Sequence, residues 1–156
     1  MTSEAVRLEK VGPIRVAFVE LTGPYESWGK GLMELKGWLE SQKVRVIGKP
    51  IGLFYDNPTE TPSNESLKSD ACFPIDGPLQ PTGKFQIKDL PPGEIAVTRH
   101  NGPPDQYTGT YGSFLEGLLK RGYVFYGPAR EVFDEARPDL RPGMGLQIQQ
   151  LVKKKD

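Results

Sequence analysis

The strongest constraint on the fold of this chain is an internal repeat. Gly23-Pro24 recurs as Gly102-Pro103, an offset of 79 residues (102 − 23), and the offset holds without a gap on to Phe54 and Phe133. Seven of the 46 aligned positions from Val11 to Asp56 are identical, where composition alone would give roughly three. Because identity alone is weak, the shared order of structural signals is what supports a duplication.

Each half carries the same succession of signals. It opens with a β-rich segment, Ile14–Leu21 or Ile95–His100, and then reaches a Gly-Pro turn that cannot continue a central strand. Four apolar positions at helical spacing follow. They are Trp28, Leu32, Leu35 and Leu39 in the first half and Tyr107, Tyr111, Phe114 and Leu118 in the second. Two more strands complete each half: Ile51–Tyr55 and Ala71–Ile75, then Arg130–Asp134 and Leu146–Val152.

We therefore expect an α+β fold in which each half is a β-α-β-β module. Module one covers about 5–75, a linker covers 76–83, and module two covers about 84–152, so that 1–156 form a single pseudo-symmetric domain. The polar, Pro-containing stretch 57–65 is predicted to be a mobile loop. Two modules side by side make one antiparallel sheet with both helices on one face. The opposite, concave face then offers a cleft for a small molecule.

Charge balance and residue usage exclude several functions. Twenty basic and twenty acidic side chains give a formal net charge of zero, whereas nucleic-acid binders carry a basic excess, so we expect no direct nucleic-acid partner. No apolar run reaches the roughly 18 residues of a membrane span, and the first residues lack the pattern of a signal peptide. We expect a cytoplasmic protein without membrane contact. A single cysteine and a single histidine are too few for the usual zinc sites, so we expect no metal and no cofactor.

Aromatic residues are the natural lining of the expected cleft. The candidates are Trp28, Tyr55, Tyr111, Phe125, Tyr126 and Phe133. Trp28 and Tyr111 also lie on the apolar stripes of the predicted helices, where core packing is the competing interpretation. Strand alternation sends Leu53 and Tyr55 to one face and Phe54 and Asp56 to the other. Tyr55 is thus either a cleft residue or a core residue whose hydroxyl finds a partner.

At this point the sequence resembles a known family, the GyrI-like small-molecule-binding domains. The resemblance rests on Pro50-Ile51-Gly52-Leu53-Phe54-Tyr55-Asp56-Asn57-Pro58, Ser69–Ile75, Leu90–Val97 and His100-Asn101-Gly102-Pro103. It covers about Val6 to Val152. The family includes effector domains of multidrug-responsive transcription regulators and a stand-alone gyrase inhibitory protein. It implies tandem modules with a ligand cleft between them. Only about ten residues precede the first matched position, so we expect a stand-alone member.

One departure from the family affects the expected ligand. Its regulators often carry a glutamate on the last strand that pairs with cationic drugs, and Gln147 stands there in this chain. A glutamine still donates and accepts hydrogen bonds but lacks the Coulombic attraction for a cation. Asp70 is the counterpart in the first half, either supplying one carboxylate to the cleft or lying exposed at the start of a strand. The predicted ligand is a planar, largely apolar or aromatic molecule, held for sensing or sequestration. The predicted ligand-binding residues are Trp28, Tyr55, Asp70, Tyr111, Phe133 and Gln147.

Two alternative functions follow from the same resemblance. Some GyrI-like proteins hydrolyse strained, cyclopropane-bearing electrophiles, and Tyr55, Asp70 and Glu116 are the candidate catalytic residues for such chemistry. The competing interpretation of Glu116 is a solvated residue on the surface of the predicted helix. The gyrase inhibitory protein implies instead a protein partner such as gyrase. Two further residues favour structural interpretations: His100 as a surface turn histidine and Cys72 as a buried, inert thiol.

Overall fold

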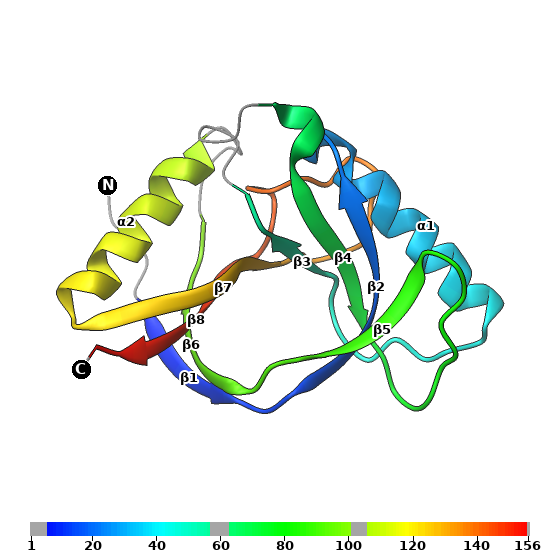
Figure 1. Cartoon of the computed structure of the whole chain (residues 1–156), viewed down its shortest axis with the longest axis horizontal. Coiled ribbons are helices and arrows are strands. Elements are labelled where there is room, and N and C mark those ends of the chain that lie inside the picture. Colours follow the sequence, from blue (N-terminus) through cyan, green and yellow to red (C-terminus); the bar gives the residue numbers. More distant parts are fainter. Residues whose placement is uncertain (1–5, 57–62, 101–105, 156) are drawn as a thin grey trace.

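The computed structural model describes residues 6–56, 63–100 and 106–155 of the chain. Ten strands and helices carry the architecture (Figure 1). In the first half they are β1 (Arg7–Val11), β2 (Ile14–Thr22), α1 (Trp28–Ser41), β3 (Ile51–Phe54) and β4 (Lys68–Pro74). In the second half they are β5 (Phe85–Leu90), β6 (Gly93–Thr98), α2 (Tyr107–Lys120), β7 (Tyr123–Val132) and β8 (Gln147–Lys154). Short 3-10 turns, η1 (Tyr25–Ser27) and η2 (Asn64–Ser66), precede α1 and β4.

The strands form one antiparallel sheet whose order is symmetric about its centre. The order is β1-β6-β8-β7-β3-β4-β2-β5, so the halves meet where β7 pairs with β3. The predicted α+β fold with an antiparallel sheet and two helices is confirmed. The β-α-β-β description of each half is incomplete, because β1 and β5 add a leading strand to each. Their sequences, RLEKV and FQIKDL, are short and rich in charge, so their strand signal is weak.

The two added strands cross between the halves. β1 pairs with β6 of the second half, while β5 pairs with β2 of the first. The β2–β5 pairing continues the register of the β1–β6 pairing, since Val11 faces Gly93 and Ile14 faces Leu90. Bends at Gly12-Pro13 and Pro91-Pro92 therefore divide one long strand pair into two, and the prolines at these bends cannot donate to a ladder. The ends of the sheet are thereby joined along the lower edge of Figure 1.

Each helix covers its own half of one face of the sheet. Under α1 lies a core that includes Leu32, Leu35 and Leu39, all at most 1% exposed. Under α2 lies a smaller core that includes Phe114, Leu118 and Ile148. In Figure 1 the helices flank the outer side of the curved sheet, one on the right and one on the left. The helical spacing predicted from the sequence therefore marks the buried stripe of both helices.

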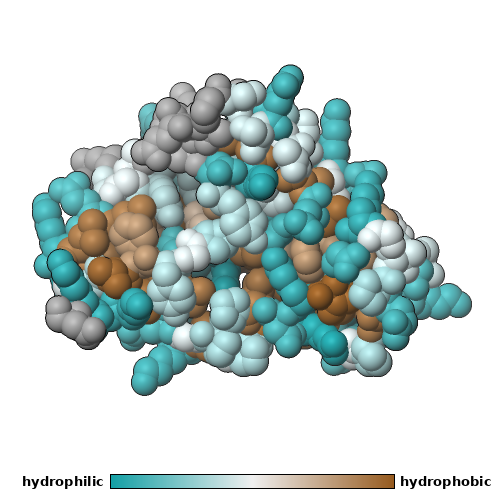
Figure 2. Space-filling model, in the orientation of Figure 1, coloured by the Kyte–Doolittle hydropathy of each residue, from teal (hydrophilic) through white to brown (hydrophobic). Residues whose placement is uncertain are grey.

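The other face of the sheet carries its own apolar residues. Val16, Ile51, Leu53, Cys72 and Leu90 form one cluster, and Ile95, Val97 and Leu151 form another. Cys72 is fully buried among them, as the interpretation of an inert thiol expects. On the outer surface, hydrophobic and hydrophilic residues are interspersed on both halves (Figure 2).

The predicted mobile loop 57–65 falls mainly outside the described residues. Only its end is described, where η2 begins. None of the helices in the described ranges is long and apolar enough to span a membrane.

We expect buried side chains of the α1 core to contribute far more to stability than exposed apolar ones. Leu35 is 0% exposed, while Leu119, on α2, is 53% exposed. Leu35→Ala should lower the free energy of unfolding by about 2–5 kcal/mol, because it leaves a cavity under α1. Leu119→Ala should change it by less than about 0.5 kcal/mol. Urea denaturation of the two variants checks this difference, and equal losses would contradict the assignment of the core.

Candidate functional site

A buried carboxyl group lies where the two halves meet. Glu131, on β7, is 0% exposed and faces Gly52 of β3 on one side and Ile148 of β8 on the other. Its Oε1 accepts hydrogen bonds from the backbone N–H groups of Gly143 (3.0 Å) and Gly145 (2.7 Å). These glycines belong to the connection between β7 and β8, which also packs on the start of α1 through the bond from Gly29 N to Leu140 O (2.9 Å).

The glycines in this connection are required by geometry. Gly143 has a φ of +98°, a conformation that other residues rarely adopt. A Cβ built on Gly145 would collide with Glu131 Cγ and lie 2.6 Å from Oε1. The segment Gly143-Met144-Gly145 thus forms a close backbone cradle for the carboxyl group.

Burial determines the protonation of Glu131. Loss of solvation raises its pKa from 4.5 to about 8, although the two glycine N–H groups act in the opposite direction. No cation is paired with this carboxyl group within the described residues. The group therefore changes charge near physiological pH.

Aromatic rings from both halves approach this part of the sheet. In the first half, Phe54 contacts Tyr25 (5.1 Å between centroids) and Trp28 (5.6 Å), and Trp28 stacks on Phe133 (4.6 Å). In the second half, Tyr107 contacts His100 (5.7 Å) and Tyr111 (6.0 Å). Phe133 lies on the same strand face as Glu131, two residues further on. The carboxyl group thus lies between two groups of aromatic side chains.

The hydroxyl of Tyr107 is the one buried side-chain polar atom without a hydrogen-bond partner in the described part of the chain. Burial raises the pKa of Tyr107, and its electrostatic interaction with Glu131 raises it further. Tyr107 and Glu131 are therefore within electrostatic reach of one another. A buried hydroxyl without a partner is costly, which favours a ligand or water at this position.

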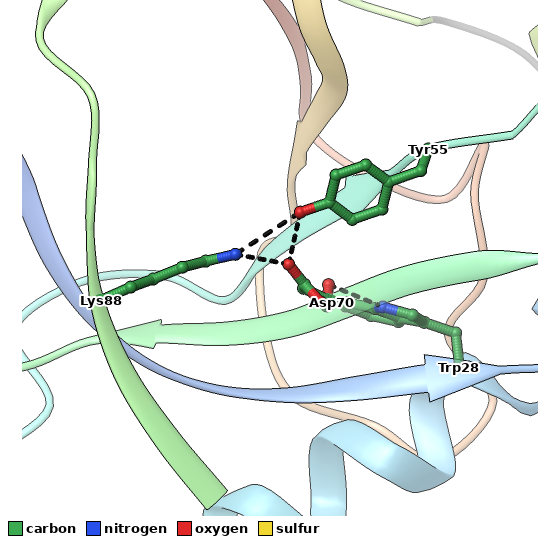
Figure 3. A network of polar contacts seen from close by, with 4 residues as sticks. All are labelled: Trp28, Tyr55, Asp70 and Lys88. Atoms are coloured by element: carbon green, nitrogen blue, oxygen red, sulfur yellow. Dashed lines mark hydrogen bonds and ion pairs between the residues drawn. The ribbon is translucent and has the colours of Figure 1, made fainter.

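A second polar cluster lies on the face opposite the helices. Asp70 Oδ2 accepts hydrogen bonds from the Tyr55 hydroxyl (2.6 Å) and from Lys88 Nζ (2.5 Å). Figure 3 shows Tyr55, just after β3, and Lys88, on β5, reaching this carboxylate, while Trp28 Nε1 donates to the backbone oxygen of Asp70 (3.2 Å). Lys88 Nζ also lies 4.2 Å from the centre of the Phe18 ring. Burial, then the bond to Asp70, raises the pKa of Tyr55, so its hydroxyl stays protonated.

A pocket beside this cluster is lined by both halves. Its volume is about 210 Å³. Leu53, Tyr55 and Lys88 contribute to it from the part of the sheet that runs from β3 to β5, and Tyr126, Arg130 and Leu151 contribute from β7 and β8. It lies on the face where the sequence predicted a cleft.

The structure does not bring the predicted ligand-binding residues into one place. Tyr55 and Asp70 lie together on the face opposite the helices. Trp28 and Phe133 lie in the α1 core, 1% and 0% exposed. The Tyr111 hydroxyl donates to Gln150 Oε1 (2.8 Å) beneath α2, and burial raises its pKa to about 12. Gln147 accepts a bond from Gln149 Nε2 (3.1 Å) at the start of β8.

Two further expectations have clear outcomes. Glu116 forms an (i, i+4) ion pair with Lys120 (3.1 Å) and its side chain is 68% exposed, as a solvated helix residue is. The surface interpretation of His100 is wrong. It is 8% exposed, and its Nδ1 lies 2.8 Å from Thr110 Oγ1, because α2 packs over the end of β6.

No group of three or more His, Cys, Asp or Glu side chains in the described ranges could hold a metal ion.

Sequence reasoning missed Glu131, although a signal for it exists. The predicted strand Arg130–Asp134 places Glu131 and Phe133 on the same face by alternation. An acidic residue sharing a face with a core aromatic is unusual. Its burial, however, depends on the glycines that follow in the connection to β8, and their contact with it is a tertiary feature.

We expect Glu131 to make stability depend on pH. Between pH 4.5 and about 8 the folded chain keeps a proton that the unfolded chain has released, so the free energy of unfolding falls as pH rises through this window. The fall should be on the order of a few kcal/mol. Glu131→Gln, which cannot ionise, should flatten the profile, whereas Glu116→Gln should leave it unchanged. Chemical denaturation between about pH 5 and 9 measures this, and parallel profiles for wild type and Glu131→Gln would contradict it.

Comparison with known proteins places these features in a family. The GyrI-like small molecule binding domain matches residues 4–145. A DNA gyrase inhibitor from Serratia proteamaculans (strain 568) is 29% identical over 119 residues, which cover 73% of this chain and 75% of that protein.

Solved structures share the fold at low sequence identity. The C-terminal domain of EcmrR superposes with a TM-score of 0.79 at 14% identity, covering 97% of this chain and 98% of that one. In the EcmrR–DNA complex this chain spans only 59% of the EcmrR chain. SAV2435 bound to tetraphenylphosphonium superposes with a TM-score of 0.54 at 9% identity, covering 97% of this chain and 94% of that one. Because the family match covers most of its length, the chain belongs to the GyrI-like small molecule binding domains.

Proposed function

We propose that this chain binds a small organic cation with aromatic groups, at Glu131 between its two halves. The observation that carries the proposal is a fully buried carboxyl group with no cationic partner within the described residues. Membership of a small-molecule-binding family supports a ligand-binding role. SAV2435, which has a related fold, is bound to tetraphenylphosphonium, an aryl-substituted cation.

Glu131 changes the expectation drawn from the sequence. Gln147 suggested a neutral ligand because it stands where the family's regulators carry a glutamate. Glu131 supplies a carboxyl group on the neighbouring strand, with its side chain on the face that carries the helices. A permanent cation nearby would favour the ionised carboxylate and lower its pKa. Binding would then release a proton wherever the free protein holds Glu131 protonated.

Aromatic side chains would hold the rest of such a ligand. Ring faces attract cations within about 6 Å and stack on aryl groups. Tyr25, Trp28 and Tyr107 supply such rings around the carboxyl group. Since Glu131 is completely covered, side chains above it have to move for a ligand to enter. Tyr107 suits this role because no partner for its hydroxyl is lost when it moves.

Tetraphenylphosphonium and tetraphenylborate test the proposal as ligands of the same shape and opposite charge. We expect the cation to bind and the anion not to bind at Glu131, as measured by isothermal titration calorimetry. Affinity for the cation should increase as pH rises towards about 8, because ionisation of Glu131 then costs less. Glu131→Gln should weaken binding of the cation by about tenfold or more.

Glu116→Gln is the matched control, since its carboxylate is exposed and paired with Lys120. It should bind the cation as wild type does. Equal binding of the cation and the anion, or undiminished binding by Glu131→Gln, would refute a role for this carboxyl group.

The same two groups favour hydrolysis of strained electrophiles as a second candidate function. A carboxyl group with a pKa of about 8 is suited to general acid–base catalysis near neutral pH. Ionised Glu131 would take a proton from water as the water oxygen attacks a cyclopropane carbon, and it would then return that proton to the other carbon of the breaking carbon–carbon bond, so that one water is added and Glu131 is regenerated. The free hydroxyl of Tyr107 would orient the water. Glu131 and Tyr107 then replace Tyr55, Asp70 and Glu116 as candidate catalytic residues.

Turnover of a cyclopropane-bearing electrophile distinguishes this function from binding alone. If the chain is a hydrolase, product forms faster than in buffer, and Glu131→Gln lowers kcat by about 100-fold or more. Tyr107→Phe, which removes only the hydroxyl, should lower kcat while leaving the affinity for tetraphenylphosphonium within about twofold. Product formation at the buffer rate by the wild-type protein would eliminate the enzymatic candidate and leave the binding proposal intact.

A further inference from the structure

A buried cation without a partner lies on the sheet face opposite Glu131. Arg130 is 5% exposed and makes no hydrogen bond or ion pair through its side chain within the described residues. Glu131 cannot neutralise it, because adjacent residues of a strand point to opposite faces. Burial lowers the pKa of the guanidinium, as expected for a charge that is largely but not completely removed from water, since its nitrogens are not among the fully buried atoms without a partner. Leaving such a group unpaired is costly, so a partner from outside the chain would be favoured.

The neighbouring charged groups do not supply that partner. Asp70 is already bound to Lys88 and Tyr55. Asp89 also lines the pocket, but it is exposed and forms no ion pair with Arg130. Glu20, which is also exposed, borders a separate pocket. Cys72 lies near Arg130, but burial raises the pKa of its thiol well above neutrality, so it carries no negative charge.

Arg130 lines the 210 Å³ pocket on this face. Lys88 places a second cation at the same pocket, and Leu53, Leu151 and Pro128 contribute apolar walls. An apolar cavity of about 150 Å³ is enough for a benzene ring. A guanidinium offers two parallel N–H donors that match the two oxygens of a carboxylate. The pocket therefore combines the guanidinium of Arg130, which is not engaged by Asp70 as Lys88 is, with room for about one ring.

We propose that this pocket is a second ligand site, which binds a small aromatic carboxylate with its carboxylate on Arg130 and its ring between the apolar walls. The site is independent of the cation site proposed at Glu131 and lies on the other face of the sheet. The anion neutralises a charge that the fold leaves unpaired, while Asp70 holds Lys88 at the rim of the pocket.

Benzoate and benzamide test the site as a charged and a neutral probe of equal size. We expect benzoate to bind and to raise the thermal midpoint of unfolding, and benzamide to bind at least about tenfold more weakly. Inorganic phosphate at equal ionic strength should also bind more weakly, because it cannot use the apolar walls. Benzamide or phosphate binding as well as benzoate would overturn the assignment.

Substitutions locate the site. Arg130→Met should abolish benzoate binding and raise the thermal midpoint of the ligand-free protein, since it removes an unpaired buried charge. Arg15→Met, at an exposed arginine of β2 outside the pocket, is the matched control and should bind benzoate normally. Asp70→Asn should increase benzoate affinity severalfold, because it frees the charge of Lys88 for the ligand. A gain of binding cannot result from misfolding.

The proposals for the two sites can be tested independently of each other. Glu131→Gln should leave benzoate binding unchanged, and Arg130→Met should leave tetraphenylphosphonium binding unchanged. Undiminished benzoate binding by Arg130→Met, or no gain in Asp70→Asn, would overturn the anion site whatever the result at Glu131.

Discussion

The pairing of two bent strands is the constraint on which the rest of the structure depends. The segment β1–β2 runs antiparallel to β5–β6 in one continuous register across both halves. Together with the β3–β7 pairing at the centre of the sheet, it fixes the halves to each other at two places. After this exchange of β1 and β5 between the halves, the two strands form the two edges of the sheet, and each is paired on one side only. The modules therefore depend on each other for their hydrogen bonds.

This closure gives the two faces of the sheet different environments. The outer face is covered by α1 and α2, and the connection from β7 to β8 packs on the start of α1. The other face retains a pocket lined by both halves. Because successive side chains of a strand point to opposite faces, Arg130 lies on the face with the pocket and Glu131 lies on the face with the helices. Neither charge can be neutralised by the other, so each is left to be compensated by a ligand or by a change of protonation.

The spacing of apolar residues predicted the helices well, because the buried residues of a helix recur at a regular interval. Trp28, Leu32, Leu35 and Leu39 form the buried stripe of α1, as their spacing indicated. The counterpart in α2 buries Phe114 and Leu118 as well. The leading strands β1 and β5 escaped prediction because their charged side chains weaken alternation, and their partners lie about 80 residues away in the chain. Non-local pairing of this kind has no signature in a short window.

The site was harder to anticipate than the fold. Strand alternation left Tyr55 as either a cleft or a core residue, and Asp70 was chosen as the counterpart of Gln147 in the first half; the two are hydrogen-bonded to each other. Gln147 was chosen by its place in the chain, but the buried carboxyl group is on β7, held by Gly143 and Gly145. His100 looked like a turn residue because the packing of α2 against it is invisible in sequence.

The sequence by itself determined the duplication, the two amphipathic helices and the α+β class, since these depend on periodicity and turn chemistry within each half. Only the tertiary structure decided which strands are exchanged, which charges are buried and which hydroxyl is left without a partner. Those properties depend on solvent exclusion by segments distant in the chain, and the pKa of a carboxyl group changes with its surroundings and not with its neighbours in sequence.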